Sequence, residues 1–409
     1  MQNRIYMDFA ASTPVDSRVE AAMAPYWREQ YGNPGAIHRE GVLARRAIER
    51  ARSSVARALG ARAEEIIFTA SGTESNAIAI FGIIKRYEQE HGYDISGVHC
   101  ITSTIEHPSV LEGFRALERR GAQVSYIGSD REGRFNLRAL DQAFDARTLL
   151  VSLMYVNNEV GTIEPIREAA KLIRAARKRT SVAQLPATSH QQPATRYQSP
   201  YFHTDASQAP FWLKVNVAEL GVDLLTIDGQ KIMGPKGVGA LYIKSGTPIA
   251  HPLFPGGKQE RGLRPGTEPV PLIVGLARAL ELAEAERERN ASYVSALRDY
   301  FLDRLVSVVP GVELNGSRAE RVANNVNISI PWLESEELII ALDSKGIALA
   351  ARSACISDGE GSYVVRAMGK GAREATSSLR FSLGPATTRE EVDICISALA
   401  RIVALRLQR

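Results

Sequence analysis

The sequence predicts an α/β fold, in which a mainly parallel sheet is covered by helices and is followed by a smaller α+β domain. Short apolar runs alternate with amphipathic helical stretches: EIIF precedes a helix from about Thr73, and VHCITS precedes one from Pro108. This alternation is typical of parallel sheets, whose neighbouring strands need helical crossovers. The chain of 409 residues is too long for one ordinary core, so two domains are expected.

The alternation continues along the chain. TLLVSLMYV leads into a helix from Pro165, and YFHTDA, DLLTID and GALYI are further predicted strands. A long charged helix, from about Pro271 to Val309, is expected to link the two domains. The smaller domain is predicted from the strands NNVNISI, IALAA and SSLRFSL and from helices near Ser335–Ser344 and Arg389–Leu407.

The composition is that of a soluble globular protein, with 44% hydrophobic and 23% charged residues and a net charge of +4. Because this charge is small and no basic arm is present, binding to nucleic acid or to a membrane is not expected. The first residues, MQNRIYMDFAAS, lack the apolar core of a signal peptide, and no segment is long enough to span a bilayer. A cytoplasmic location is therefore expected.

The three cysteines are far apart and have no metal-ligand spacing, so neither a metal site nor a disulfide is expected. Cys100 and Cys395 lie in apolar patterns and are predicted to be inert core residues. Cys355 lies in the Ser- and Gly-rich stretch ARSACISDGEGSY, where an exposed thiol can act as a nucleophile. An incidental surface thiol is the alternative interpretation.

One segment departs from the α/β pattern. Residues 181–200 are rich in Pro, Ser, Thr and Gln and have no apolar period, which indicates a loop or a partly disordered insertion. The segment enters the strand YFHTDA at its N-terminal end, whereas ligands gather at the C-terminal ends of strands. We therefore expect it on the far side of the sheet from the chemistry.

Lys231 has the most unusual surroundings of any lysine in the sequence. It follows the predicted strand DLLTID and precedes the Gly-Pro-Lys-Gly turn at 234–237. A buried lysine can form a Schiff base with a carbonyl group, and flanking glycines allow backbone to approach a ligand closely. Asp205 ends the strand YFHTDA and can pair with a protonated pyridine nitrogen, a combination expected of pyridoxal phosphate (PLP) enzymes. A solvated loop lysine and a helix cap at Asp205 are the alternatives.

Three more motifs follow predicted strands or lie within one. Gly72 and Thr73, in FTASGTESNA, can hold a phosphate at a helix N-terminus, and an ordinary cap by Ser71 or Thr73 is the alternative. His107 begins a helix in STIEHPSV, where it can be catalytic or structural. Arg380 lies in the apolar strand SSLRFSLG, where it can grip a substrate carboxylate or form a structural ion pair.

These motifs occur together in one known family. The sequence resembles the cysteine desulfurases, of the subgroup that serves iron–sulfur cluster assembly and tRNA thiolation, within the fold-type I PLP enzymes. The resemblance covers nearly the whole chain, because YMDFAASTPVD, GNPGAIHREG, FTASGTESN, EHPSV, VNNEVGT, HTDASQ, KIMGPKGVGALY, ERGLRPGTEPV, SACIS and LRFSLG occur in family order. It implies a large domain with a seven-stranded sheet at residues 16–285. Residues 1–15 and 286–409 would form a small domain that carries the Cys355 loop.

The resemblance also implies the role of each site residue. Lys231 would bind PLP covalently, Cys355 would accept sulfur, and His107 would stack on the ring and assist proton transfer. Asn33 and Arg380 would hold the substrate carboxylate. The other implied cofactor contacts are Gly72, Thr73 and Gln230 at the phosphate, Asp205 at the pyridinium nitrogen, Gln208 and Asn158 near the phenolic oxygen, and Thr267 reaching the phosphate of the partner subunit.

The activity implied by the resemblance is the removal of sulfur from L-cysteine, which yields L-alanine and a persulfide on Cys355. A sulfur-acceptor protein would then take the sulfur, and the enzyme would be a homodimer. The alternatives are a selenocysteine lyase, a small aminotransferase, and a PLP-fold protein that has lost catalysis and serves as a binding partner. The thiol in SAC argues against an aminotransferase, which needs none.

The sequence departs from this family just before the lysine. The usual Ser-Gly-His is replaced by Asp228, Gly229 and Gln230. Gln230 can still donate a hydrogen bond to a phosphate, whereas a carboxylate facing a phosphate would be repelled. We therefore predict that Asp228 points away, toward a backbone N–H or a basic side chain behind the strand. Tyr155 replaces a common His in the strand before VNNE.

Overall fold

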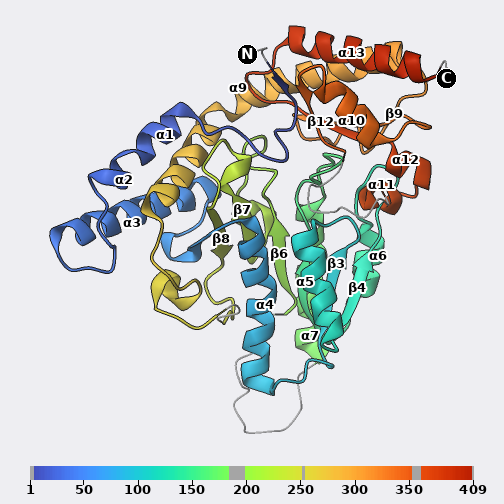
Figure 1. The fold of residues 1–409 in the computed structure, drawn as a ribbon. Helices are drawn as coiled ribbons and strands as arrows, with labels where there is room; N and C mark the ends of the chain where they lie inside the picture. The colour runs from blue at the N-terminus through green and yellow to red at the C-terminus, as the bar shows by residue number, and fades with distance from the viewer. Residues whose placement is uncertain (1–3, 184–198, 251–253, 352–360, 408–409) are drawn as a thin grey trace.

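A seven-stranded sheet forms the centre of the computed structural model, which describes residues 4–183, 199–250, 254–351 and 361–407 (Figure 1). β8 runs antiparallel to both of its neighbours, β2 and β7, and every other neighbouring pair is parallel. The predicted mainly parallel sheet is therefore confirmed. The strands in spatial order are β2 (Ile66–Thr69), β8 (Gly239–Ile243), β7 (Leu224–Asp228), β6 (Tyr201–Asp205), β5 (Thr148–Ser152), β3 (His99–Ser103) and β4 (Gln123–Ile127).

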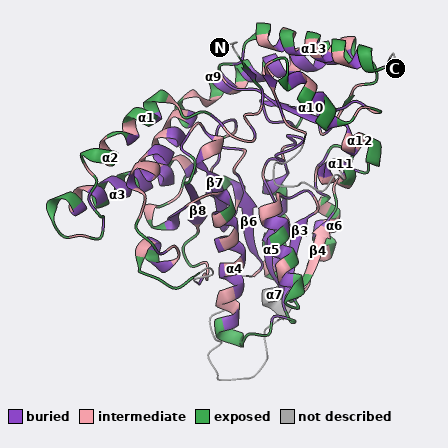
Figure 2. Ribbon diagram, in the orientation of Figure 1, coloured by how far each residue is buried: buried purple, intermediate pink, exposed green. Residues whose placement is uncertain are grey.

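Helices cover both faces of this sheet, so its central strands are buried throughout (Figure 2). Successive strand residues point to opposite faces: Leu150 joins the apolar cluster on one face, and Val151 joins the cluster on the other. The first face packs against α4 (Gly72–His91) and α5 (Pro108–Arg119). The second packs against α3 (Arg39–Leu59), α7 (Ile166–Ala183) and α9 (Val270–Val308).

A second, smaller group of elements stands at the C-terminal end of the chain. Its antiparallel sheet contains β12 (Ser378–Ser382), β10 (Asn325–Ser329) and β9 (Glu313–Leu314). Near the N-terminus, β1 (Ile5–Tyr6) pairs in parallel with β11 (Ile347–Ala348), so the start of the chain packs on this C-terminal group. The predicted strand IALAA is thus only two residues long. The helices of the group are α10 (Ser335–Asp343), α11 (Tyr363–Ala367), α12 (Ala372–Thr376) and α13 (Arg389–Leu407).

The remaining elements are short. They are the helices α1 (Ser17–Met23), α2 (Pro25–Arg28), α6 (Leu137–Ala143) and α8 (Val217–Leu220) and the 3₁₀ turns η1 (Ala63–Glu65), η2 (Gly229–Lys231) and η3 (Gln259–Gly262). Within the described parts of the chain, no helix is both long and apolar enough to cross a membrane. The predicted insertion at 181–200 lies mostly outside the described residues, between the end of α7 at Ala183 and the start of β6 at Tyr201.

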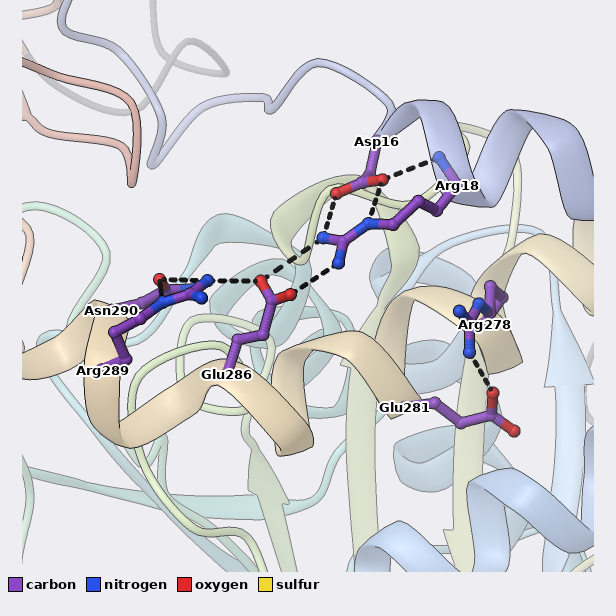
Figure 3. A network of polar contacts seen from close by, with 7 residues as sticks. All are labelled: Asp16, Arg18, Arg278, Glu281, Glu286, Arg289 and Asn290. Carbon is purple, nitrogen blue, oxygen red and sulfur yellow. Dashed lines mark hydrogen bonds and ion pairs between the residues drawn. The ribbon is translucent and has the colours of Figure 1, made fainter.

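A network of ion pairs ties α1 to the long helix α9 (Figure 3). Asp16 caps α1 by accepting a hydrogen bond from the N–H of Arg18, and its carboxylate also pairs with the Arg18 guanidinium at 2.7 Å. Arg18 reaches Glu286 on α9, which in turn pairs with Arg289 at 3.0 Å. The network holds the chain that leads from the N-terminal segment into the large sheet's helices.

Candidate active site

One cavity of about 270 Å³ lies where the C-terminal ends of five strands of the large sheet meet the N-terminal segment and β12. Ligand sites in open α/β sheets gather at this edge. The described residues around it are Ala10, Ala11, Gly72, Thr73, Asn76, His107, Ser109, Met154, Val156, Asn158, Asp205, Ser207, Gln208, Asp228, Gln230, Lys231 and Arg380. The fold therefore brings together nine of the predicted site residues: Gly72, Thr73, His107, Asn158, Asp205, Gln208, Gln230, Lys231 and Arg380.

Lys231 ends the 3₁₀ turn η2, directly after β7, and reaches into the cavity. Its Nζ donates hydrogen bonds to the carbonyl oxygens of Ala10 at 2.9 Å and Ala11 at 2.6 Å. Burial lowers the pKa of Lys231, and the charge of Arg380 adds to this effect against the opposing carboxylate of Asp228. The amine is thereby brought closer to a neutral, nucleophilic state.

The glycines near Lys231 serve a purpose other than the one predicted. A Cβ on Gly229 would lie 2.8 Å from the carbonyl oxygen of Pro235, and one on Gly234 would lie 2.8 Å from that of Gly229. The two glycines thus let the turn pack tightly against itself. The prediction that they allow backbone to approach a ligand is wrong for these two positions.

Asp205 is fixed at the end of β6 by two hydrogen bonds. Its Oδ2 accepts from Nδ2 of Asn76 on α4 at 2.8 Å, and its Oδ1 accepts from the N–H of Ser207 at 2.9 Å. No helix begins at Asp205, so the alternative of a helix cap is not what the structure contains. Below it, burial lowers the pKa of His203 to about 4, so this histidine is neutral near pH 7. Asp205 remains the anionic group at this end of the cavity.

His107 caps α5, which is its structural interpretation, and it also lines the cavity, as a catalytic role would require. The N–H of Ser109 donates to Nδ1 at 3.2 Å, and the Ser109 hydroxyl lies 2.8 Å from the same atom. Because Nδ1 accepts a hydrogen bond, the proton of the neutral imidazole is on Nε2. Burial lowers the pKa of His107, which favours this neutral form.

Arg380 is almost fully buried and forms the structural ion pair that was its alternative interpretation. Its Nη2 donates to Oδ1 of Asp8 at 2.9 Å, an ion pair between β12 and the N-terminal segment, and its Nη1 donates to the carbonyl oxygen of Asn158 at 2.8 Å. Among the described residues, neither its Nε nor Oδ1 of Asn158 has a hydrogen-bond partner. Both atoms lie on residues that line the cavity, so a ligand there can satisfy them.

Asp228 contradicts the prediction made for it. Its carboxylate lines the cavity, and Oδ2 accepts a hydrogen bond from the N–H of Gly72 at 3.2 Å. Oδ1 accepts from the backbone N–H of Gln230 at 3.1 Å, and the Gln230 side chain donates to Oδ2 at 3.3 Å. The partner is a backbone N–H, as expected, but it belongs to the helix start that is predicted to bind phosphate. The reason is geometric: the first N–H groups of a helix have no acceptor within the helix, and α4 begins opposite the end of β7.

Two predicted site residues, Asn33 and Thr267, do not line the described cavity, and a third, Cys355, cannot be placed relative to it. Asn33 lies on the loop between α2 and α3, at the outer edge of the molecule, where its side chain accepts from the N–H of Gly35 at 2.8 Å (Figure 1). Thr267 is exposed on the segment before α9. Cys355 falls in residues 352–360, outside the described residues. Cys100 and Cys395 are buried core residues, as predicted, and burial raises the pKa of each thiol to about 12.

Several residues near the cavity have no counterpart in the sequence-based predictions. Asn76 lies one helical turn after Gly72 and Thr73, and Ser207 is the last residue of the DAS motif that begins at Asp205. A polar side chain this close to a predicted site residue was the available signal. Glu106 precedes His107 and is fully buried, with Oε1 accepting from the Ser103 hydroxyl at 2.6 Å and from the N–H of Met154 at 2.9 Å. Burial raises the pKa of Glu106 to about 8, so this acid stays largely protonated near neutral pH.

Comparison with known proteins gives consistent matches along the chain. The profile of the aminotransferase class-V family matches residues 5–192 and 182–395, and the two stretches meet inside the segment predicted as an insertion. "Cysteine desulfurase IscS" of Dictyoglomus turgidum is 42% identical over 404 residues, which is 98% of this chain and 95% of the relative. "Cysteine desulfurase IscS" of Rickettsia massiliae is 40% identical over 398 residues, 97% of this chain and 90% of the relative.

Solved structures agree with these relatives. A structure described as "NIFS-LIKE PROTEIN" superposes with a TM-score of 0.86 at 34% identity, covering 98% of this chain and all of that one (100%). A structure described as "SspA in complex with cysteine" gives a TM-score of 0.75 at 32% identity and covers 94% of this chain and 100% of the other. The similarity therefore extends over both sheets and the cavity between them.

Proposed function

Because this chain belongs to the aminotransferase class-V family, and within it to the cysteine desulfurases, we propose that the cavity around Lys231 is where PLP binds and where sulfur is removed from L-cysteine. The chain is a PLP-dependent enzyme by this membership. The observation that supports the assignment to this cavity is the joint placement of Lys231 and Asp205 on neighbouring strand ends. The relatives favour a desulfurase over the alternatives of a selenocysteine lyase or an aminotransferase.

The residues at one end of the cavity suit the ring of the cofactor. Asp205 offers a carboxylate to a protonated ring nitrogen, and His107 offers a neutral imidazole beside it. Asn158 and Arg380 each have a buried polar atom that lacks a partner among the described residues, as a site for a polar ligand requires. At the other end, the Asp228 carboxylate lies beside the start of α4 and does not suit an anion there.

The bound cofactor supplies an electron-withdrawing ring, which makes the Cα proton of an amino acid acidic. Lys231 both anchors the cofactor and, with its pKa lowered by burial, can accept this proton. Asn76 and the N–H of Ser207 keep the Asp205 carboxylate in place, where it would hold the protonated ring nitrogen. Arg380 draws the substrate carboxylate toward the side of the cavity formed by β12.

Sulfur transfer is assigned to Cys355. Its thiolate attacks the sulfur atom of the substrate, the carbon–sulfur bond breaks with its electron pair left on the substrate carbon, and a persulfide forms on Cys355. Protonation of that carbon gives L-alanine. The proposal is supported by the position of Cys355 in a motif that matches the family, and by the deep burial of Cys100 and Cys395.

The rest of the assembly is proposed on the same basis. In a homodimer, Thr267, which does not line this chain's own cavity, would contribute to the site of the partner subunit, and a sulfur-acceptor protein would take the persulfide sulfur in the cytoplasm. The division into residues 16–285 and residues 1–15 with 286–409 is supported by the pairing of β1 with β11. Sedimentation at micromolar concentration tests the dimer, because a stable monomer that holds PLP would contradict it.

The decisive experiment measures products and the modified residue together. Purified protein is given a limited amount of L-cysteine, and alanine and sulfide are assayed for the wild type and for Cys355→Ser. Mass spectrometry of tryptic peptides should show added sulfur on Cys355 and none on Cys100 or Cys395. Undiminished alanine production by the variant would contradict the persulfide step.

A further inference from the structure

The Asp228 carboxylate lies against the start of α4, the place where the proposed cofactor would put its phosphate. Only 7% of Asp228 is exposed, and its Oδ2 accepts a hydrogen bond from the N–H of Gly72. Contact is close, because a Cβ on Gly72 would lie 3.2 Å from the same oxygen. The carboxylate and a phosphate would therefore need the same N–H group.

Two anions cannot share this corner of the cavity at low cost. A phosphate monoester carries close to two negative charges near neutral pH, and a carboxylate can only accept hydrogen bonds while it is ionised. The cavity's positive charge is limited: Lys231 and Arg380 line it, His107 is held neutral, and Asp205 adds a further negative charge. Glu74, in the first turn of α4, pairs with Arg264 at 3.4 Å and so leaves little net charge there.

We propose that Asp228 couples binding of the cofactor phosphate to the uptake of one proton. Solvent supplies the proton to the carboxyl group as the phosphate arrives. The new O–H donates to a phosphate oxygen, and the N–H of Gly72 passes from the carboxylate to the phosphate. This inference rests on the proposed function, since it requires that PLP binds at Lys231.

The coupling predicts a specific pH dependence. Within the pH range in which binding drives this proton uptake, wild-type affinity for PLP should fall by about tenfold per pH unit relative to a variant that lacks the carboxyl. Asp228→Ser and Asp228→Asn both remove the charge, and both can still accept the N–H of Gly72 and donate to a phosphate. The other titrating groups, Lys231, His107 and the phosphate itself, are present in every variant, so the comparison cancels them.

The experiment is a PLP titration of the wild type, Asp228→Ser, Asp228→Asn and the control Asp16→Ser between about pH 6 and pH 9. Binding is followed by the visible absorbance of the cofactor at Lys231. Calorimetry in two buffers of different ionisation enthalpy counts the protons. Asp16 caps α1 outside the cavity, so Asp16→Ser should behave as wild type. Thermal unfolding of each variant checks that it is folded.

The expected result is that both Asp228 variants bind PLP at least about tenfold more tightly than wild type at pH 8, with about one proton fewer taken up. Equal pH slopes and equal proton uptake in all variants would overturn the inference and leave the cofactor site standing. Pyridoxal without phosphate should show no such difference, and the same difference with it would also overturn the inference. If no variant forms an adduct at Lys231 at any pH, the proposed function falls together with it.

Discussion

At the end of the cavity formed by β3, β5 and β6, the Asp205 carboxylate is held by Asn76 and Ser207 and faces the space where a cationic ring nitrogen is expected. At the end formed by β2 and β7, the Asp228 carboxylate instead takes the Gly72 N–H that an anionic ligand would use. Both are aspartates at the ends of parallel neighbouring strands, and both are buried. Asp205 suits the cofactor and Asp228 does not. The reason is the group that each carboxylate faces, and not the residue type.

The difference teaches that a strand-end carboxylate cannot be assigned a role from its position alone. Glu106 makes the same point from a third environment. It accepts two hydrogen bonds but faces no cation, and burial raises its pKa to about 8. The four predictions that follow test this contrast, from the largest expected effect to the smallest.

Removal of Lys231, which lines the cavity together with both aspartates, should have the largest effect. Lys231→Ala should lower the rate of alanine formation by at least ~10²–10⁴-fold, because the residue that moves the Cα proton is gone. It should also abolish the PLP adduct that borohydride fixes to the protein, measured by peptide mass spectrometry. The matched control is Lys236→Ala, whose side chain only donates to the carbonyl oxygen of Thr13 at 2.9 Å. An adduct that persists without Lys231 would refute its assignment.

The ring end is tested by neutralising its carboxylate. Asp205→Asn keeps the shape of the side chain but removes the charge that would stabilise a protonated ring nitrogen. The loss of a charge-assisted hydrogen bond, about 1.5–3 kcal/mol, should lower kcat/KM by roughly 10–100-fold. The bound cofactor's absorbance should shift in the variant, which a purely structural role would not cause. An unchanged spectrum and an unchanged kcat/KM would contradict the assignment of Asp205 to the protonated ring nitrogen.

Glu106 provides a stability test of the same region. The folded state holds a proton on this carboxyl up to about pH 8, whereas the unfolded chain releases it near 4.5. The folded state thus binds more protons between these values, so the free energy of unfolding should fall as pH rises from about 4.5 to about 8. Over this pH range, the free energy of unfolding of Glu106→Gln should fall by roughly 2–4 kcal/mol less than that of the wild type. Denaturant unfolding at several pH values measures the difference.

One other buried titrating group, His203, also affects these curves. His203 acts with the opposite sign, because its pKa is lowered to about 4, so its contribution is lost as pH falls below 6.5. It is present in both proteins and cancels in the difference. The matched control is Glu112→Gln, an exposed residue on α5 that pairs with Arg115 at 2.6 Å. An equal flattening in this control would show that Glu106 does not hold the proton.

The smallest effect is expected at the start of α4. A Cβ in Gly72→Ala would lie 3.0 Å from the Ser207 hydroxyl and 3.2 Å from Oδ2 of Asp228. These contacts are tight but can relax, so we expect a loss of about 1 kcal/mol in PLP binding, or several-fold in Kd. The loss caused by Gly72→Ala should be smaller when it is measured in the Asp228→Ser background, because the shorter side chain makes room. Strictly additive effects of the two substitutions would show that Gly72 and Asp228 do not share the binding region.

Much of the fold could be predicted from the sequence, since it depends on local pattern. The strands that are apolar throughout, such as β5 and β7, and the 39-residue helix α9 are close to their predicted positions. The strands that were not predicted are the half-exposed edge strand β4 and the two-residue strands β1 and β9. Edge and very short strands carry little apolar periodicity, because only part of their surface is buried.

The sequence by itself determined which residues end the central strands, and hence that Lys231, Asp205, His107 and Gly72 would meet at one edge of the sheet. The common direction of parallel strands brings their C-terminal ends together regardless of side-chain detail. Only the tertiary structure decided where the Asp228 carboxylate points. Its partner, Gly72, is 156 residues away in the chain, and an unsatisfied helix N–H attracts the nearest anion whatever ligand the site is expected to bind.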